Sequence, residues 1–274
     1  MSVATASLTD PPTAVRALWD ELVGLTEDLD EADWGRPTPC PAWTVGELIT
    51  HCAAAQFEFD RSAPRPDPPP DWTPPADAHV LDAWTARQVA ARSGWTPAQR
   101  LAELRTAAHG HVARVNAVED WAAPTPGPLG ETTEAGLLAV RCYDLWVHLQ
   151  DLREALGLPT PAATELAAAT LAYRYAADLA GWLFARRAGA SEGATMALRL
   201  GAPLGLDTVL EVRDGRGRHS RGADPGVCAV TGHPAAFTLL VSGRGHPERW
   251  RELGLLDWSG PRGEEFVACA RVFG

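Results

Sequence analysis

Two histidines and two aspartates stand at spacings that could do chemistry. Asp144 and His148 are four residues apart, and Asp151 follows three residues later, so a helix would project all three from one stripe. A carboxylate and an imidazole are costly to bury without a partner, and a divalent cation is an efficient one. His51 could supply a third ligand from a separate segment. Two nitrogens and one carboxylate oxygen leave an open coordination position, which is typical of a catalytic zinc site.

The same residues have an ordinary interpretation, which spacing alone favours. Asp144 and His148 can form an i, i+4 pair on a helix surface, and His51 can be a hydrogen-bonded core histidine. Pairs with this spacing are common on helices that hold no ion. From the residues alone, both interpretations stay open.

The segments that carry these residues are predicted to be long helices. A capping box at Thr44 and Glu47 opens one of them. Its apolar-side positions are Leu48, His51, Cys52, Ala55 and Phe59, so His51 should point inward. The segment from about Thr132 to Leu156 forms another, because Gly157 and Pro159 follow it as a stop signal.

Two further helices should complete a bundle. One begins at Pro11 behind Thr9 or Asp10, and the other begins behind a capping box at Thr96 and Gln99. The first has an apolar stripe at Val15, Leu18, Trp19, Leu22, Leu25 and Leu29. The second should bury Leu101, Leu104, Ala108, Val112 and Val115. Seven prolines from Pro64 to Pro75 predict a stiff, exposed connection.

The pattern changes towards the C-terminus. A helix should start at Thr160 and Pro161 and run to Gly189, after which apolar residues alternate. Strands are expected at 196–200, 209–212 and 227–231, and short helices at 234–241 and 264–272. The expected fold class is α+β, with a helical domain at 1–190 and a small α/β domain at 191–274.

Composition excludes several classes of function. All 24 basic residues are arginine, so chemistry that needs a lysine ammonium is excluded, including Schiff bases and the usual phosphate loop. The net charge of -11 argues against a nucleic-acid partner. No apolar run approaches the ~18 residues of a membrane span. The first ten residues lack a secretory signal pattern, so a cytoplasmic location without a membrane partner is expected.

The five cysteines are odd in number and contain no C-x-x-C pair. They are expected to be free and mostly buried thiols rather than disulfides or metal ligands, and they are Cys40, Cys52, Cys142, Cys228 and Cys269.

Two motifs resemble one known family. The first is T-P-C-P-A-W-T-V-G-E-L-I-T-H from Thr38 to His51, and the second is R-C-Y-D-L-W-V-H-L-Q-D-L-R-E-A-L-G from Arg141 to Gly157. Together they resemble the mycothiol-dependent maleylpyruvate isomerase family. The resemblance implies a DinB-like four-helix bundle followed by a sterol-carrier-protein-like C-terminal domain. It also implies a divalent metal, usually zinc, held by His51, Asp144 and His148.

One position departs from the family pattern. The family usually has Glu where this chain has Asp144, whose carboxylate is one methylene shorter. The shorter side chain should reduce metal affinity, and if it cannot reach, two histidines remain in a vestigial site. Asp151 is expected to hydrogen-bond His148 rather than to bind the metal.

The resemblance implies a thiol-dependent isomerase or S-transferase. Mycothiol would be the cosubstrate, and a metal-bound thiolate would attack a small electrophilic substrate. Arg244, within Ser242-Gly243-Arg244-Gly245, resembles a Gly-Arg step of the family, so it is a candidate thiol or substrate contact, although an exposed turn arginine is an equally ordinary interpretation. The alternative function is a non-catalytic DinB-like binding or interaction protein. A monomer or homodimer is expected.

Overall fold

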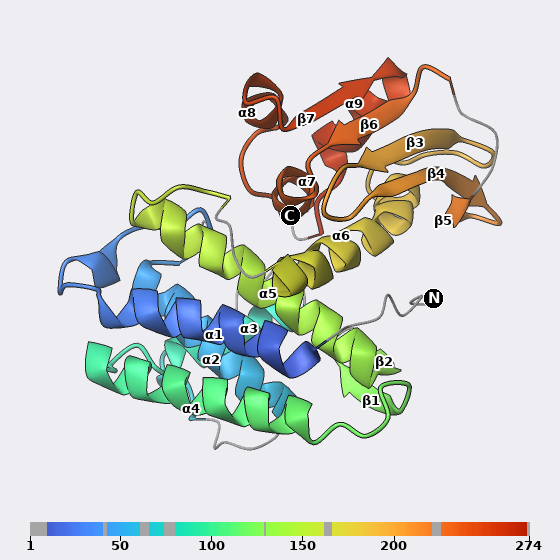
Figure 1. Cartoon of the computed structure of the whole chain (residues 1–274). Coiled ribbons are helices and arrows are strands. Elements are labelled where there is room, and N and C mark those ends of the chain that lie inside the picture. Colours follow the sequence, from blue (N-terminus) through green and yellow to red (C-terminus); the bar gives the residue numbers. More distant parts are fainter. Residues whose placement is uncertain are drawn as a thin grey trace. The chain divides into compact units, whose positions relative to one another are not determined.

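The chain divides into a helical unit and a unit built on a sheet. The computed structural model describes residues 10–40, 43–60, 66–73, 80–128, 130–161, 166–220 and 226–272. Two compact units are present, Met1–Ala168 and Ala169–Gly274. The first is helical, and the second contains a mixed sheet with helices (Figure 1). The expected α+β class is therefore confirmed, while the division into domains at residue 190 stays a prediction.

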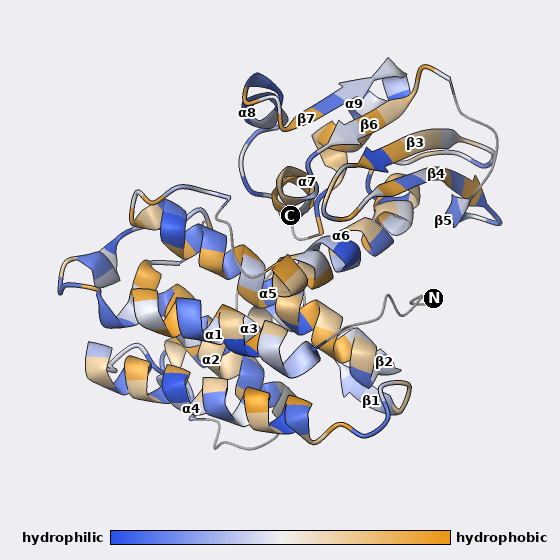
Figure 2. Ribbon diagram, viewed as in Figure 1, coloured by the Kyte–Doolittle hydropathy of each residue, from blue (hydrophilic) through white to orange (hydrophobic). Residues whose placement is uncertain are grey.

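Long helices make up most of the first unit. They are α1 (Pro11–Glu27), α2 (Val45–Asp60), α3 (Val80–Ala90), α4 (Pro97–Asn116) and α5 (Glu134–Ala155). Helices α1 and α2 each contact both α4 and α5, so these four form a bundle. Hydrophilic and hydrophobic residues alternate along α1 and α4, as in amphipathic helices (Figure 2).

The helix starts follow the sequence signals. The Asp10 side chain accepts a hydrogen bond from the Thr13 N–H, so Asp10 is the N-cap of α1, while the alternative cap, Thr9, lies outside the described residues. Thr96 and Gln99 form the predicted capping box of α4. These local contacts satisfy backbone donors that the first turn leaves unpaired.

The buried face of α4 differs from the predicted one. Leu104 and Val115 are buried as expected, but Leu101, Ala108 and Val112 are only partly covered. The fully buried positions of this helix are Arg100, Leu104, Ala107, His111 and Val115. The prediction counted only apolar residues, whereas two polar side chains turn inward because the neighbouring helices offer them hydrogen-bond partners.

Two elements of the first unit were not predicted. Helix α3 has no strong apolar stripe in its sequence, and its partner is α2. The segment expected to be a loop contains an antiparallel hairpin of β1 (Pro124–Gly127) and β2 (Gly130–Thr133). Such short, glycine- and proline-rich strands exist through pairing rather than propensity. A 3₁₀ turn at Asp33–Gly35 precedes α2. Residues 66–73 of the proline-rich connection form a turn without helix or strand.

The second unit confirms the predicted strands and one of its helices. Within the described residues, the sheet has the strand order β5-β4-β3-β6-β7, with β3 and β6 parallel and the other pairs antiparallel. The strands are β3 (Thr195–Leu200), β4 (Leu206–Arg213), β5 (Arg216–Ser220), β6 (Ala229–Gly232) and β7 (Leu256–Ser259). The helices are α6 (Leu166–Arg186), α7 (Pro234–Val241), α8 (Pro247–Glu252) and α9 (Gly260–Cys269).

Some boundaries in this part of the chain were wrong. Thr160 and Pro161 are bends rather than the start of α6, and residues 162–165 lie outside the described part. Helix α9 begins at Gly260 instead of Glu264, and β5, α8 and β7 were not predicted. Among the helices of the described residues, none is both long and apolar enough to span a bilayer.

Candidate metal centre

Helix α2 carries His51 towards the interior of the bundle. The predicted capping box is present, since the Thr44 N–H donates to Glu47 Oε2 at 2.8 Å and the Glu47 N–H donates to Thr44 Oγ1 at 3.4 Å. This start fixes the phase of the helix, and Leu48, Cys52 and Ala55 are buried beside His51 as expected. The side chain of Phe59 lies outside what the structure describes.

Helix α5 carries the other predicted site residues. It begins after Thr133, whose hydroxyl accepts a hydrogen bond from the Gly136 N–H at 3.1 Å. His148 and Asp151 are buried, whereas the Asp144 side chain is one-quarter exposed. The i, i+4 spacing on one helix therefore places the carboxylate of Asp144 beside the ring of His148, as predicted.

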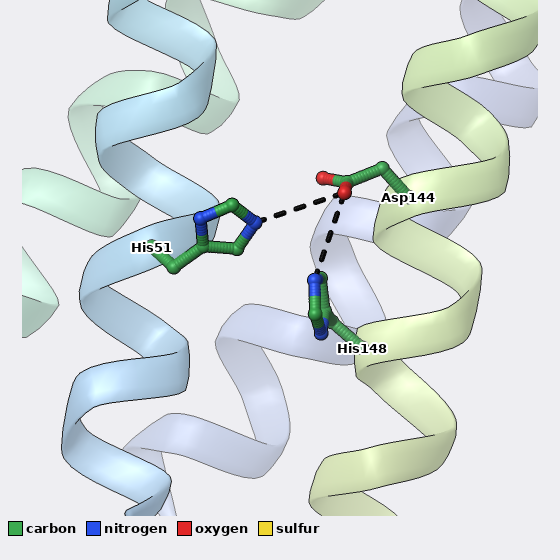
Figure 3. A group of neighbouring side chains, drawn as sticks. All are labelled: His51, Asp144 and His148. Carbon is green, nitrogen blue, oxygen red and sulfur yellow. Dashed lines mark ion pairs between the residues drawn. The ribbon is translucent and has the colours of Figure 1, made fainter. Parts of the chain in front are cut away.

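The two helices bring three potential ligand groups together. Among the described residues, His51, Asp144 and His148 each offer a ligand atom, and these atoms all lie within 4.8 Å of one another. Asp144 Oδ1 is 3.7 Å from His51 Nε2 and 3.6 Å from His148 Nε2. Figure 3 shows the carboxylate reaching from α5 towards α2, with one oxygen facing both rings. The shorter aspartate side chain thus does reach the two histidines.

These distances fit a divalent metal after small side-chain movements. Zinc bonds of about 2.0–2.2 Å to nitrogen and oxygen place neighbouring ligands of a tetrahedron roughly 3.4 Å apart. The Asp144 oxygen is a few tenths of an ångström further from each histidine nitrogen than that. The three ligand atoms as a set lie within 4.8 Å of one another, so the side chains would have to turn inward to bind an ion, and the chemistry of two imidazoles and one carboxylate fits a divalent metal.

Asp151 makes the hydrogen bond with His148 that the sequence predicted. Asp151 Oδ2 lies 3.0 Å from His148 Nδ1, and the carboxylate is 1% exposed. Because a carboxylate accepts, Nδ1 carries the proton and donates, so that in the neutral ring the lone pair of Nε2 is directed at Asp144 and His51. The ring therefore presents a nitrogen that is ready to coordinate.

Arg141 and Gln56 belong to the site but were not predicted. Arg141 Nη1 donates to Asp144 Oδ2 at 2.7 Å, and Arg141 Nε donates to Gln56 Oε1 at 3.2 Å. The i, i+3 spacing of Arg141 and Asp144 within the second motif is a signal that could have found the first contact. Gln56 lies on another helix, so only the fold reveals it.

Trp43 covers the imidazole rings. Its indole stacks on His51 with ring centroids 4.5 Å apart, and it is tilted against His148 at 5.9 Å. The residue immediately precedes the capping box of α2, and this places an aromatic face over the two potential ligands. The indole restricts the ring orientations and excludes water from that side.

The electrostatics of the cluster favour an ionised aspartate. Burial by itself would raise the pKa of Asp144, but the positive charge of Arg141 and the close approach of both histidines outweigh it and hold this pKa well below its usual range. Burial lowers the pKa of His51 despite its contact with Asp144. Burial also opposes protonation of His148, but the nearby carboxylates of Asp144 and Asp151 outweigh it and raise its pKa.

The chain's own thiols beside the site are not ready nucleophiles. All five cysteines fall within the described residues and are free thiols as expected, but only Cys52 and Cys142 are buried, so the expectation of mostly buried thiols was wrong. Burial, and then the nearby charge of Asp144, raises the pKa of Cys52 well above its ordinary value. Burial raises the pKa of Cys142 to about 12. Both therefore stay protonated at neutral pH and behave as core residues.

Arg244 lies in the second unit, in the turn that follows α7. Its Nη1 donates to the Ser242 carbonyl at 2.6 Å, and its own carbonyl accepts from Trp250 Nε1 at 3.2 Å. These contacts define a local turn. A role for Arg244 in contacting thiol or substrate stays a prediction.

Together these features define a class of protein, namely a helical bundle with a candidate His-Asp-His metal centre joined to a mixed α/β unit. The model of the mycothiol maleylpyruvate isomerase N-terminal domain family matches residues 15–153, slightly more than half of the 274 residues. The chain therefore belongs to this family, which confirms the expectation from the two motifs. All three candidate ligands lie in the matched segment.

The chain is also similar to an uncharacterized relative and to two solved structures. An uncharacterized protein of Mycobacterium tuberculosis, MT0763 in strain CDC 1551 and Rv0738 in strain H37Rv, is 27% identical over 165 residues, which cover 60% of this chain and 76% of the relative. A crystal structure of the mycothiol-dependent maleylpyruvate isomerase matches with a TM-score of 0.56 and 19% identity, over 89% of this chain and 92% of that one. A histidine-to-alanine mutant of that enzyme matches with a TM-score of 0.55 and 18% identity, over the same shares. This likeness shows a shared fold.

Proposed function

We propose that this chain is a mycothiol-dependent metalloenzyme, an isomerase or S-transferase that acts on a small electrophilic substrate. The observation that carries the proposal is the convergence of His51, His148 and Asp144 from two helices, in a chain that belongs to the maleylpyruvate isomerase N-terminal domain family. Two imidazole nitrogens and one carboxylate oxygen suit zinc and leave a position for a further ligand.

The protein groups around the site have distinct tasks in this proposal. A bound zinc ion would lower the pKa of an incoming thiol, so that a thiolate is present at neutral pH. Asp151 holds the proton of His148 on Nδ1 and thereby directs Nε2 to the centre. Trp43 covers the ring of His51 and shields it from water. The partly exposed side of Asp144 gives the incoming molecule its access.

In this proposal a cosubstrate supplies the reactive thiol, because the two buried cysteines beside the site are poor nucleophiles. Cys52 and Cys142 are both fully buried, and burial raises the pKa of each. A protonated, enclosed thiol is a poor nucleophile. An external thiol that reaches the site past Asp144 has neither obstacle, which supports mycothiol or a related molecule as the cosubstrate.

A second candidate function is a non-catalytic binding scaffold, and one observation favours it. The polar groups of the cluster already partner one another, because Asp144 pairs with Arg141 through one oxygen and faces both histidines with the other. A vestigial site would keep this network without binding a metal. The bundle would then serve only to bind a ligand or another protein.

Metal content separates the two candidates. Elemental analysis of the purified full-length protein, after zinc loading and dialysis, should find close to one zinc per chain. His51→Ala and His148→Ala should each abolish this retention. His109→Ala is the matched control, because this histidine is exposed on α4, and it should retain zinc as the wild type does. A wild-type protein that retains no metal would establish the second candidate.

Calorimetry then tests the thiol. Titration of the zinc-loaded protein with mycothiol should release or absorb heat, whereas the metal-free protein and the His148→Ala variant should give none. Zinc retention without any heat from mycothiol would leave a metal site but refute mycothiol as the cosubstrate.

A further inference from the structure

Arg141 is tied to both helices that supply the candidate ligands. Its guanidinium carries a positive charge, yet the residue is only 2% exposed. Nη1 donates to Asp144 Oδ2 at 2.7 Å on α5, and Nε donates to Gln56 Oε1 at 3.2 Å on α2. A buried charge with two fixed partners has little freedom to move, so it can fix the orientation of a neighbouring group.

Because of the contact with Arg141, the two carboxylate oxygens of Asp144 have different partners. Oδ2 is held by the guanidinium, while Oδ1 alone faces the histidine nitrogens at 3.6 and 3.7 Å (Figure 3). A carboxylate can hold a cation through one oxygen or through both. With Oδ2 engaged, Asp144 is left to offer a single oxygen.

The charges around the centre also favour an anionic ligand in the open coordination position. A divalent cation would be balanced by the two carboxylates of Asp144 and Asp151, which leaves no net charge. Arg141 adds one positive charge next to this group. A net positive centre attracts an anion into the open position, and the buried setting strengthens the attraction.

We infer that Arg141 is a positioning residue that keeps Asp144 a one-oxygen ligand and keeps a coordination position open for an anionic ligand such as a thiolate. The inference rests on the proposed function, because it requires a metal at this site. Without Arg141, the carboxylate can turn and offer both oxygens, and the centre loses its net charge. Metal binding should then stay tight, while binding of an added anion should weaken.

Cobalt(II) and azide provide the test, since the visible spectrum of cobalt reports coordination. The wild type should bind cobalt, and azide should change its spectrum. Arg141→Met should bind cobalt at least as tightly as the wild type does, and its weaker visible bands should indicate a higher coordination number. Its affinity for azide should be about ten-fold lower than that of the wild type, or lower still. Arg141→Lys keeps the charge, so its azide affinity should stay within about three-fold of wild type.

Arg262→Met is the matched control, because Arg262 and Glu265 form an i, i+3 ion pair at 2.6 Å on α9. It should leave the cobalt and azide affinities unchanged. If Arg141→Met does not fold, Gln56→Leu serves instead: it keeps the charge but releases the guanidinium from α2, and azide affinity should fall about three-fold.

The possible outcomes separate the inference from the proposed function. A wild type that binds no cobalt refutes both. If the wild type binds cobalt and azide, and Arg141→Met binds azide with unchanged affinity, the inference is refuted but the proposed function is not. Parallel weakening of cobalt and azide would also overturn it, because that result indicates a merely structural role.

Discussion

The helical unit contains two buried polar clusters that differ in how their hydrogen-bond donors and acceptors match. One surrounds Arg92 and Arg100, which contact α3, α4 and the start of α2. The other is the candidate metal centre on α2 and α5. Both bury charge in the same bundle, so burial of charge alone does not distinguish a structural cluster from a functional one.

In the first cluster, donors meet acceptors. Arg92 Nε donates to both carboxylate oxygens of Glu103 at 2.9 and 2.8 Å, and its Nη1 donates to Gln88 at 3.0 Å. Arg100 donates to the carbonyls of Arg92 and Gly46 at 2.9 and 3.1 Å. Every guanidinium nitrogen of both residues thus has an acceptor within the protein, and in this sense the network is closed.

In the second cluster, three potential metal ligands face one another at longer distances. Asp144 Oδ1 lies 3.7 Å from His51 Nε2 and 3.6 Å from His148 Nε2, which is longer than an ordinary hydrogen bond. A divalent cation bound by the two neutral rings and the carboxylate would complete this arrangement. The two clusters therefore differ in whether the protein's own groups satisfy one another at hydrogen-bond distance.

The largest expected effect concerns the closed cluster. Arg92→Met leaves the buried carboxylate of Glu103 without its partner, so the free energy of unfolding should fall by about 3–5 kcal/mol in urea denaturation. Zinc retention should not change. Arg87→Met, at an exposed position of α3, should change stability by no more than about 0.5 kcal/mol. A loss below about 1 kcal/mol for Arg92→Met would contradict the closed network.

The second prediction concerns stabilisation by metal. Zinc at about a hundred times its dissociation constant should raise the free energy of unfolding by about 2.7 kcal/mol, because it binds the folded state. A chelator should reverse this gain, and His51→Ala should show none. Thermal or urea unfolding with and without zinc measures the effect. Equal stabilisation of His51→Ala would place the metal elsewhere.

The third prediction tests the contact between Asp151 and His148. Asp151→Asn removes the charge that holds Nδ1 protonated, so zinc affinity should fall about 10–100-fold in competition with a chromogenic chelator. Glu154→Gln is the control, since Glu154 is exposed one turn further along α5. Asp151 acts only in packing if both variants bind zinc equally.

The smallest expected effect concerns a third buried histidine, His111. Its Nδ1 accepts a hydrogen bond from Trp19 Nε1 at 3.0 Å, so a donor again meets an acceptor. Burial, with the nearby charges of Arg141 and Arg114, lowers the pKa of His111 well below its ordinary value. The folded state therefore favours the neutral ring, which contributes stability above the ordinary pKa of about 6.5.

The sign of the pH dependence follows from that shift. As pH falls below about 6.5, the unfolded chain binds a proton that the folded chain refuses, so stability should fall by up to about 1.4 kcal/mol per pH unit. His111→Gln keeps an acceptor for Trp19 and should lose less stability over the same range in urea titrations. Identical slopes for both proteins would disprove the assignment.

Much of the fold could be predicted because it depends on local contacts. The starts of α1, α2 and α4 follow from side chains three residues away, at Asp10, Thr44 and Thr96. The alternation of apolar residues in β3 and β4 identified them as strands. Strand β7 could not be predicted in this way, because its partner β6 lies elsewhere in the chain, and the local hairpin β1–β2 was missed because its glycine and proline residues have low strand propensity.

The contacts of the candidate site likewise divide into local ones, which residue spacing predicted, and long-range ones, which it did not. The contacts of Asp144 and Asp151 with His148 lie within one helix, so residue spacing predicted them. The contact of Gln56 with Arg141 spans α2 and α5, and nothing in the spacing of either segment indicates it.

The sequence by itself determined the long helices α1, α2, α4 and α5, the strands β3, β4 and β6, and the side of α5 on which the polar residues stand, because turns and helical periodicity act over a few residues. Only the tertiary structure decided that His51 and Trp43 meet Asp144 and His148, and that Arg141 takes one oxygen of the carboxylate. The physical reason is that packing of distant helices fixes these distances, whereas local spacing only fixes the faces that can meet.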